Sequence, residues 1–564
     1  MRDHPRTMHR YAMGLAVAVA LASAPARARG QGDTLKYTFH YARDGQGPRL
    51  DVDVDFRGDR SGVTRLEMPT SWGGEDSLWK AIVEFDAGPG VTLGPLIDGV
   101  RMAGHLPGAH VHLHYVLRQD WTGPLRYPLY HRVIVDSSRV IFNQSNALVF
   151  PDRTSSATPV LQIRWTGLPR TWRILTSFGA KAMFSGPVSL REFSGASFAA
   201  GDFRLVSPPD SGGVTVEAQG RWRFSDPDFA RMVRALWGAE TEFWGTPAFD
   251  KAFVLLLPIT DPNTLAGTAF TAGFVAAADS TADLDPMGRL LAHELFHLWN
   301  GQRLAATHDE ARYKWFTEGF TDYYADRIFR DLGHYSDSVY RGRVNAVLRN
   351  YYGSPARGGT RAQVAARYWT DERWKTYPYA QGYALALYLQ ANLPRWSGSP
   401  FNLDSLMVTA FHAAHGQNIE VTDSLLVRLV PATARAPFDD AIDRYVDRGE
   451  MVPADSTALG RCVAVRNVAA FTFDLGFDAL ATARDRVVRG VRAGGPAAQA
   501  GIADGMKLLG YRWDGGDPSS PVLLEIDADG GPRLVRYVPH GNQAFVAPQY
   551  VATPGAPGCL TLGN

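Results

Sequence analysis

The sequence predicts a multidomain α+β protein, and three observations support this fold class. The chain has 564 residues, which is enough for two to four domains. Hydrophobic residues make up 45% and charged residues 20% of the chain, a balance that is typical of globular proteins and excludes wholesale disorder. Strand-like patterns fill the chain to about residue 206, helical patterns follow to about residue 448, and strands return after residue 453.

The first 28 residues have the pattern of a secretory signal peptide. Three arginines precede an apolar run from Met13 to Ala24, and small residues at Ala26 and Ala28 suit cleavage. The apolar run is short for a bilayer span. No cysteine follows it, which argues against a lipoprotein. We therefore expect an exported protein, periplasmic or secreted, with no membrane span after cleavage. The alternative is an uncleaved N-terminal anchor.

Residues 33–206 are predicted to form a β-rich N-terminal domain. Residues 50–56 and 111–117 alternate between apolar and polar side chains, as half-buried strands do. His110, His112 and His114 share one face of the second strand. A metal site there is one interpretation, but no fourth ligand lies nearby in the sequence, and we expect a solvated face.

Residues 207–450 are predicted to form a mainly helical domain. Residues 226–236 begin with Asp226 as the expected N-cap and Pro227 at the first helical position, and then show apolar spacing near 3.6, which is typical of a helix. A short buried strand is expected at residues 253–257. Long helical patterns cover residues 286–300, 315–332 and 377–393.

Residues 455–550 are predicted to form a compact module that contains strands. Strand signals at residues 474–477 and 487–491 precede a small-residue turn and short helix at residues 494–502. The two cysteines of the chain, Cys462 and Cys559, bracket this segment. Because export permits oxidation, we expect a disulfide between them; two free thiols are the alternative.

A metal-binding pattern lies in the central domain. His293-Glu294-Leu295-Phe296-His297 places two imidazoles at i and i+4 on one helix face, where both can reach one ion. Glu294 beside them can reach a water at that ion. Zinc needs a third protein ligand, for which we predict Glu318, and Asp322 one turn later is the candidate partner for the second nitrogen of a ligand histidine. One Zn²⁺ per chain is expected.

This arrangement suits hydrolysis with Glu294 as general base. The developing oxyanion needs a further donor, and Tyr377, Tyr379 and Tyr383 open a later helix that can supply one. From the residues alone, none of the three tyrosines is favoured.

Two longer stretches extend the pattern into a family resemblance. His293–Asn300 (HELFHLWN) and Trp315–Tyr324 (WFTEGFTDYY) resemble the gluzincin metallopeptidases, in particular the sixty-first metallopeptidase family, whose type member is a glycyl aminopeptidase. The resemblance extends over nearly the whole mature chain. It implies a thermolysin-like catalytic domain between the β-rich N-terminal domain and a C-terminal PDZ-like domain.

Further residue roles are implied by this resemblance. Tyr379-Ala380-Gln381-Gly382 is similar to the Tyr-x-Lys-Gly pattern of the family, which makes Tyr379 the oxyanion-stabilising tyrosine, with Gln381 in place of lysine. The family's Gly-Gly-x-Glu-His-like substrate strand corresponds to Gly267, Thr268, Ala269 and Phe270, but no acid is present in this stretch. Leu475, Gly476 and Phe477 resemble the peptide-binding loop of PDZ domains.

The function predicted from the sequence is that of an exported zinc-dependent peptidase, aminopeptidase-like by resemblance but without the acid that anchors the substrate amine. An endopeptidase, a non-catalytic peptide-binding protein and a zinc hydrolase that acts on something other than peptides are the alternatives. The expected partner is a peptide or protein substrate. For the PDZ-like domain, capture of a C-terminal or extended peptide is one interpretation, and a domain that only packs on the catalytic one is the alternative. A net charge of +1 argues against nucleic acid.

Overall fold

The computed structural model describes residues 34–152, 158–208, 213–262, 264–304, 309–414, 420–513, 518–528 and 531–553. The predicted signal peptide and Cys559, and with it the predicted disulfide, lie outside the described residues. Within these ranges, no helix combines the length and apolar character needed to cross a membrane.

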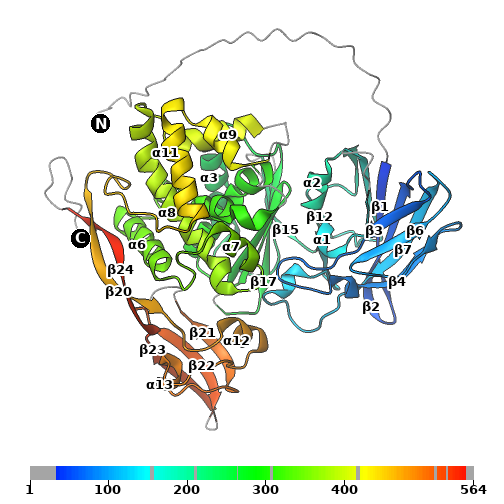
Figure 1. Cartoon of the computed structure of the whole chain (residues 1–564). Coiled ribbons are helices and arrows are strands. Elements are labelled where there is room, and N and C mark those ends of the chain that lie inside the picture. The colour runs from blue at the N-terminus through cyan, green and yellow to red at the C-terminus, as the bar shows by residue number, and fades with distance from the viewer. Residues whose placement is uncertain are drawn as a thin grey trace, which may run out of the picture.

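The N-terminal region is rich in β-structure, as predicted (blue to cyan in Figure 1). Its six-stranded sheet has the order β13 (Met183–Pro187), β11 (Val160–Thr166), β1 (Thr34–Asp44), β2 (Gly47–Arg57), β7 (His110–Leu117), β4 (Ile82–Ala87). A second sheet has the order β10 (Phe150–Pro151), β3 (Val63–Glu67), β6 (Val100–Gly104), β5 (Thr92–Leu93). A third has the order β12 (Arg173–Thr176), β14 (Ser197–Gly201), β9 (Arg139–Asn143), β8 (Ile134–Val135). Two short helices, α1 (Gln144–Ala147) and α2 (Leu190–Ser194), accompany these sheets.

The alternating strands β2 and β7 bury one face and expose the other. Val52 and Val54 are fully buried, whereas the histidine row of β7 faces carboxylates of β2. His112 Nδ1 lies 3.0 Å from Asp55 and His114 Nδ1 lies 2.9 Å from Asp53. The side chain of His110 is 70% exposed, so the expected solvated face is confirmed.

The central region begins with a five-stranded sheet in the order β15 (Arg204–Ser207), β16 (Val214–Ala218), β17 (Ala252–Ile259), β19 (Gly273–Asp279), β18 (Leu265–Phe270). Strands β16, β17 and β19 are parallel, while β15 and β18 are antiparallel edges. Strand β15 starts at Arg204, within the range predicted for the N-terminal domain. Its strand pattern does not tell which sheet it joins.

Helices cover this sheet and form most of the central region (green to yellow in Figure 1). They are α3 (Asp226–Trp244), α4 (Leu284–Phe296), α5 (Thr321–Asp331), α6 (Asp337–Gly353), α7 (Arg361–Arg367), α8 (Glu372–Ser397), α9 (Leu403–Ala414), α10 (Asp423–Leu429) and α11 (Ala432–Ile442). Ser225, not Asp226, caps α3, because the Ser225 side chain accepts a hydrogen bond from the Asp228 N–H. The core includes the fully buried Trp244 and Trp299.

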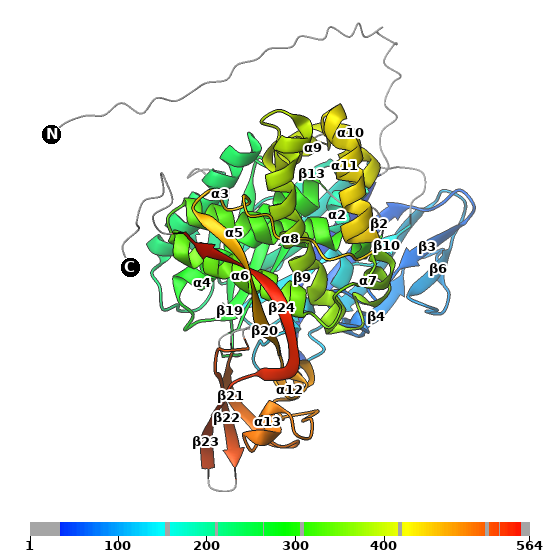
Figure 2. The same cartoon turned by 60° about the vertical axis from the view of Figure 1, so that its left-hand side comes forward.

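The C-terminal module contains a long two-stranded ladder, β20 (Val463–Phe473) with β24 (His540–Ala552), and a three-stranded sheet, β21 (Lys507–Arg512), β22 (Val522–Ala528), β23 (Gly531–Tyr537). Figure 2 shows the ladder lying along α6. Asn345 on α6 donates to the Tyr550 carbonyl at 2.9 Å and accepts from the Tyr550 N–H at 2.8 Å.

Two strands expected in this module are absent from the described structure. Asp474–Phe477 form a turn after β20, and residues 487–491 make a single β-bridge, between Val487 and Lys507. Helices α12 (Ala479–Asp485) and α13 (Pro496–Gln499) follow these segments. The short apolar runs fill the core of the module through side chains such as Leu475 and Val488 rather than through strand pairing.

Candidate metal centre and active site

Helix α4 brings His293 and His297 together. Both face the same side because they are one turn apart, and their Nε2 atoms lie 3.0 Å from each other. Each side chain is largely buried. The helix ends at Phe296 with His297 as its cap, and a π-helical turn over residues 298–303 redirects the chain.

Glu318 completes the cluster from a second segment. It lies in a π-helical turn at Trp315–Phe320 that leads into α5, and its Oε2 is 3.1 Å from His297 Nε2 and 3.5 Å from His293 Nε2. The three potential ligand atoms lie within 4.8 Å of one another. In the part of the chain that the structure describes, no other group of three His, Cys, Asp or Glu side chains meets this criterion, and the histidine row of β7 therefore does not.

The hydrogen bonds of the two imidazoles fit a bound cation. His293 Nδ1 contacts Asp322 Oδ1 at 2.8 Å and His297 Nδ1 contacts the Asn300 carbonyl at 3.0 Å. Both partners accept only, so each Nδ1 donates, and each Nε2 faces the Glu318 carboxylate. Two Nε2 atoms and a carboxylate that face one another favour a positive charge between them, which a proton or a metal ion can supply. Two imidazoles and one carboxylate are a donor set that zinc takes in catalytic sites.

A buried ionic network holds the predicted partner Asp322. Arg289 Nη2 donates to Asp322 at 2.6 Å, and Arg289 Nε donates to the fully buried Asp326 at 3.0 Å. Sequence reasoning missed Arg289 and Asp326. The signal was present, because Arg289 precedes His293 by four residues and Asp326 follows Asp322 by four, the spacing that places side chains on one helix face.

Asn300 joins the two segments of the site. Its side-chain amide donates to the Phe316 carbonyl at 3.0 Å and to Thr321 Oγ1 at 3.1 Å, and the residue is fully buried. Its own carbonyl accepts from His297. The asparagine at the end of the HELFHLWN stretch thus ties the end of α4 to the turn that carries Glu318.

Two glycines let α8 approach that turn. A Cβ on Gly319 would lie 2.5 Å from Gly382 Cα, and a Cβ on Gly382 would lie 1.8 Å from the Trp315 carbonyl oxygen. Only glycine fits at such a backbone contact. This crossing places the start of α8, with its tyrosines, against the metal cluster.

The structure separates the candidate tyrosines. The ring of Tyr379 lies nearly parallel to the His293 ring at 6.3 Å, whereas Tyr377 is buried against Tyr351 with ring centroids 5.8 Å apart. Tyr383 is also buried, and its hydroxyl donates to Asp326. Gln381, at the position of the family's lysine, is buried and donates to the Tyr445 carbonyl at 2.8 Å.

The predicted substrate strand lies at the sheet edge beside Glu294. Within its sheet β18 pairs with β19 alone, and the Ala269 N–H donates to the Glu294 carboxylate. A Cβ on Gly267 would lie 3.0 Å from both Cγ and Oε1 of Glu294. From the N-terminal region, the Tyr130 hydroxyl donates to the Gly267 carbonyl at 3.3 Å, and His131 Nε2 lies 3.4 Å from Thr268 Oγ1. Phe270 is buried against Trp72.

The electrostatics of the site favour positive charge. Burial lowers the pKa of the His293 imidazole, but the charge and hydrogen bond of Asp322 outweigh burial and raise this pKa to about 10. Burial raises the pKa of the Glu318 carboxyl, yet the charges of Lys314 and His297 hold it well below its usual range. Burial raises the pKa of Glu294 above its ordinary value. Surroundings that favour a proton on His293 also favour a divalent cation.

The predicted peptide-binding loop of the C-terminal module makes contacts within the module itself. Leu475 and Phe477 are buried in the module core, and the Gly476 N–H donates to the Asp474 carboxylate at 2.7 Å. The Tyr537 hydroxyl donates to the Leu475 carbonyl at 2.6 Å. Binding of a C-terminal peptide at this loop stays a prediction.

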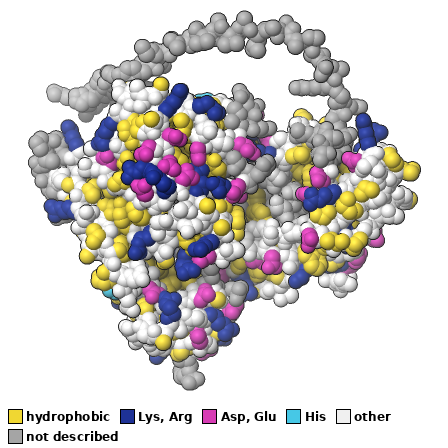
Figure 3. Space-filling model, viewed as in Figure 1, with side chains coloured by type: hydrophobic (Ala, Val, Ile, Leu, Met, Phe, Trp, Pro, Cys, Tyr) yellow, Lys and Arg dark blue, Asp and Glu magenta, His cyan; other side chains and the backbone are white. Residues whose placement is uncertain are grey.

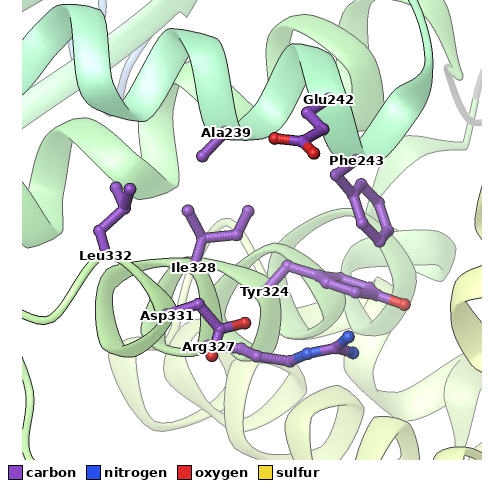
Figure 4. A pocket seen from close by; sticks show the side chains of 8 residues that line it. All are labelled: Ala239, Glu242, Phe243, Tyr324, Arg327, Ile328, Asp331 and Leu332. Carbon is purple, nitrogen blue, oxygen red and sulfur yellow. The ribbon is translucent and has the colours of Figure 1, made fainter. Parts of the chain in front are cut away.

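A pocket of about 310 Å³ lies elsewhere, between α3 and α5 (Figure 4). Apolar side chains, among them Phe243 and Ile328, line it together with Glu242, Asp331 and Arg327. Arg327 also binds Asp404, with its Nη1 and Nη2 each 2.6 Å from a carboxylate oxygen. None of the predicted site residues lines this pocket.

Comparison with known proteins supports a peptidase. Residues 287–390 match the model of a family described as M61 glycyl aminopeptidase, and this segment contains His293, Glu294, His297, Glu318 and Tyr379. No match was found among curated proteins.

The fold resembles that of a solved aminopeptidase N family protein from Idiomarina loihiensis, with 15% identity, a TM-score of 0.66, and coverage of 91% of this chain and 97% of the other. An M1 zinc metallopeptidase from Deinococcus radiodurans, solved alone and as a variant with a Tyr-Ser-Ala substrate, is 16% identical with a TM-score of 0.49. The match covers 75% of this chain. It covers 95% of the Deinococcus protein solved alone and 96% of the variant in the substrate complex. The family-model match supports a peptidase, and the likeness to the Idiomarina protein shows the multidomain architecture in which a β-rich region precedes a helical one.

Proposed function

We propose that this chain is an exported zinc-dependent peptidase. The observation that carries the proposal is the convergence of His293 Nε2, His297 Nε2 and a Glu318 oxygen, with the Glu294 carboxylate beside them under the edge of β18. These three ligands would hold one Zn²⁺. When bound, the ion supplies Lewis-acid chemistry: it polarises a peptide carbonyl and makes a water more acidic. Export is proposed from the N-terminal sequence.

Other residues of the chain would then have separate roles in peptide hydrolysis. Glu294 accepts the proton of the attacking water and passes it to the amine that leaves. The edge of β18 that no other strand of its sheet covers aligns the substrate by strand addition. Tyr379, whose ring lies nearly parallel to the His293 ring, donates its hydroxyl hydrogen to the oxygen of the carbonyl as negative charge develops on it.

Metal analysis with matched variants tests the zinc site. We expect about one zinc per chain in the purified protein and loss of metal in the double variant His293→Ala/His297→Ala. The variant His112→Ala/His114→Ala removes two histidines from β7 and should keep the metal, since their side chains face solvent and carboxylates of β2. Stoichiometric zinc in the first variant would contradict the proposed site.

The variant Glu294→Gln tests the reaction separately. It should retain zinc and lose peptidase activity by more than the roughly 10²–10⁴-fold expected for a single acid–base group, because Glu294 also orients the water. Near-normal hydrolysis by a zinc-loaded Glu294→Gln protein would rule out this mechanism, and activity that resists chelation would rule out the metal.

A further inference from the structure

Lys314 is a buried cation beside the candidate metal centre that the sequence did not single out. It precedes Glu318 by four residues, and its Nζ donates to Glu318 Oε1 at 3.0 Å. Its side chain is only 8% exposed, although Nζ also pairs with Glu310. Burying an ammonium is costly unless opposite charge compensates it, so the Glu318 contact is a defined part of this site.

The two oxygens of Glu318 have different partners. Oε2 faces the two imidazoles, at 3.1 Å from His297 and 3.5 Å from His293. Oε1 is turned away and accepts from Lys314. A carboxylate held in this way offers one oxygen to an ion, whereas a free carboxylate can rotate and offer both.

Lys314 also packs on the side of the site that holds Tyr379. Its Nζ lies 5.4 Å from the ring centre of the buried Tyr368, within the range of a cation–π contact. A hydrogen bond joins the side chains of Tyr368 and Tyr379. Lys314 thus contacts both Glu318 and Tyr368, and Tyr368 is hydrogen-bonded to Tyr379.

We propose that Lys314 is a positioning residue that fixes Glu318 as a one-oxygen ligand and offsets its charge, and so sets the metal affinity and the turnover of the site. This inference rests on the proposed function. It does not make Lys314 a catalytic residue, because Lys314 acts through Glu318. Partners that hold metal ligands in place typically contribute 10- to 100-fold in metal affinity or activity.

The test is the zinc affinity of Lys314→Met, measured by competition with a chelator and independent of activity. We expect affinity to fall 10- to 100-fold, and kcat of the zinc-saturated variant to fall with little change in KM. The matched control is Glu310→Gln, which removes the other partner of Lys314, a side chain that is 57% exposed, and should keep both values within about threefold.

A double-mutant cycle shows whether Lys314 acts through Glu318. If it does, adding the Lys314 substitution to Glu318→Gln should weaken zinc binding less than twofold further. The proposal is overturned if the effects of the Lys314 and Glu318 substitutions on zinc affinity are fully additive. It is also overturned if a folded variant without the Lys314 charge keeps wild-type zinc affinity. Lys314→Gln serves this purpose if Lys314→Met does not fold, with an expected loss of three- to tenfold. Absence of zinc from the wild-type protein would instead refute the proposed function.

Discussion

At the scale of single residues, the carboxylate of Glu294 is buried and has few polar contacts. The Ala269 N–H donates to its carboxylate, and the nearby imidazoles of His293 and His297 partly offset the burial that raises its pKa. The balance leaves the pKa of Glu294 above its ordinary value of 4.5. A base with a raised pKa accepts a proton more readily, which suits its proposed role.

This shift predicts the acid side of the pH profile. Glu294 must be ionised to accept a proton, so kcat/KM should fall as the pH drops through its pKa, and the midpoint should lie above 4.5. The measurement is kcat/KM against pH, with zinc content and circular dichroism followed in parallel to exclude metal loss and unfolding. A zinc-loaded, folded protein with constant kcat/KM down to pH 4 would contradict the raised pKa.

Tyr379 gives a second prediction at this scale. Replacing Tyr379 by Phe removes one hydroxyl, and kcat should fall by roughly 10²-fold or more with little change in KM, because the lost hydrogen bond forms with the developing oxyanion. Tyr377→Phe is the matched control on the same helix, buried against Tyr351, and should keep kcat within about threefold. The opposite result would transfer the role to Tyr377.

At the scale of elements, the close contact between β18 and α4 sets the position of the base. The Gly267 position has no room for a side chain, because a Cβ there would lie 2.4 Å from the Phe274 ring and 3.0 Å from Glu294. Gly267→Ala should therefore displace Phe274 or Glu294, at about 1–3 kcal/mol of strain. We expect peptidase activity at least tenfold lower with zinc content retained.

The control for this variant is Gly238→Ala. Gly238 lies in α3, and a Cβ there meets no atom within 4 Å. Alanine favours helix more than glycine does, so stability should rise slightly and activity should not change. Full activity of Gly267→Ala would show that β18 does not constrain Glu294.

Several elements could be predicted from the sequence because one local pattern determines each of them. The alternating segments and the apolar run form strands β2, β7 and β17, as predicted. His293, His297 and Glu318, predicted as metal ligands, lie close together in the structure. The spacing of Arg289 and Lys314 was visible in the sequence, but their roles were missed, because Arg289 meets its partners on another helix and Lys314 meets Glu318 in a turn whose shape no pattern specifies. The role of Asn300 was missed because its partners lie in another segment. Strands do return after Pro453, but the two expected at residues 474–477 and 487–491 were wrong for a similar reason, since short apolar runs can fill a core without pairing.

At the scale of the whole molecule, the N-terminal β region forms one side of the candidate site. Tyr130 donates to the Gly267 carbonyl, and the Thr271 hydroxyl donates to the Glu192 carbonyl at 2.9 Å. Arg173 of β12 donates to the fully buried Glu217 of β16 at 2.7 Å. These contacts tie the two regions together beside β18 and at β16.

Acidic and basic side chains are mixed on the surface of the molecule. Figure 3 shows basic and acidic side chains interspersed over the visible face, and the net charge of the chain is +1. That nucleic acid is not a partner stays a prediction from composition.

End specificity depends on which charges surround the bound substrate, and it gives the last prediction. An aminopeptidase must compensate the α-ammonium of its substrate, because a buried ammonium without a partner is costly. Residues 267–270 contain no acid. In the part of the chain that the structure describes, Trp72, Tyr130, His131 and Glu294 contact them from outside their sheet, and of these only Glu294 is acidic and it is assigned to the water. We therefore expect residues on both sides of the cut to be tolerated, and N-acetylation to lower kcat/KM less than tenfold. The measurement compares identical peptides with free and acetylated N-termini at low substrate concentration. A preference of a hundredfold or more for the free amine, about 2.7 kcal/mol, would instead establish a strict aminopeptidase with a carboxylate supplied from another part of the fold.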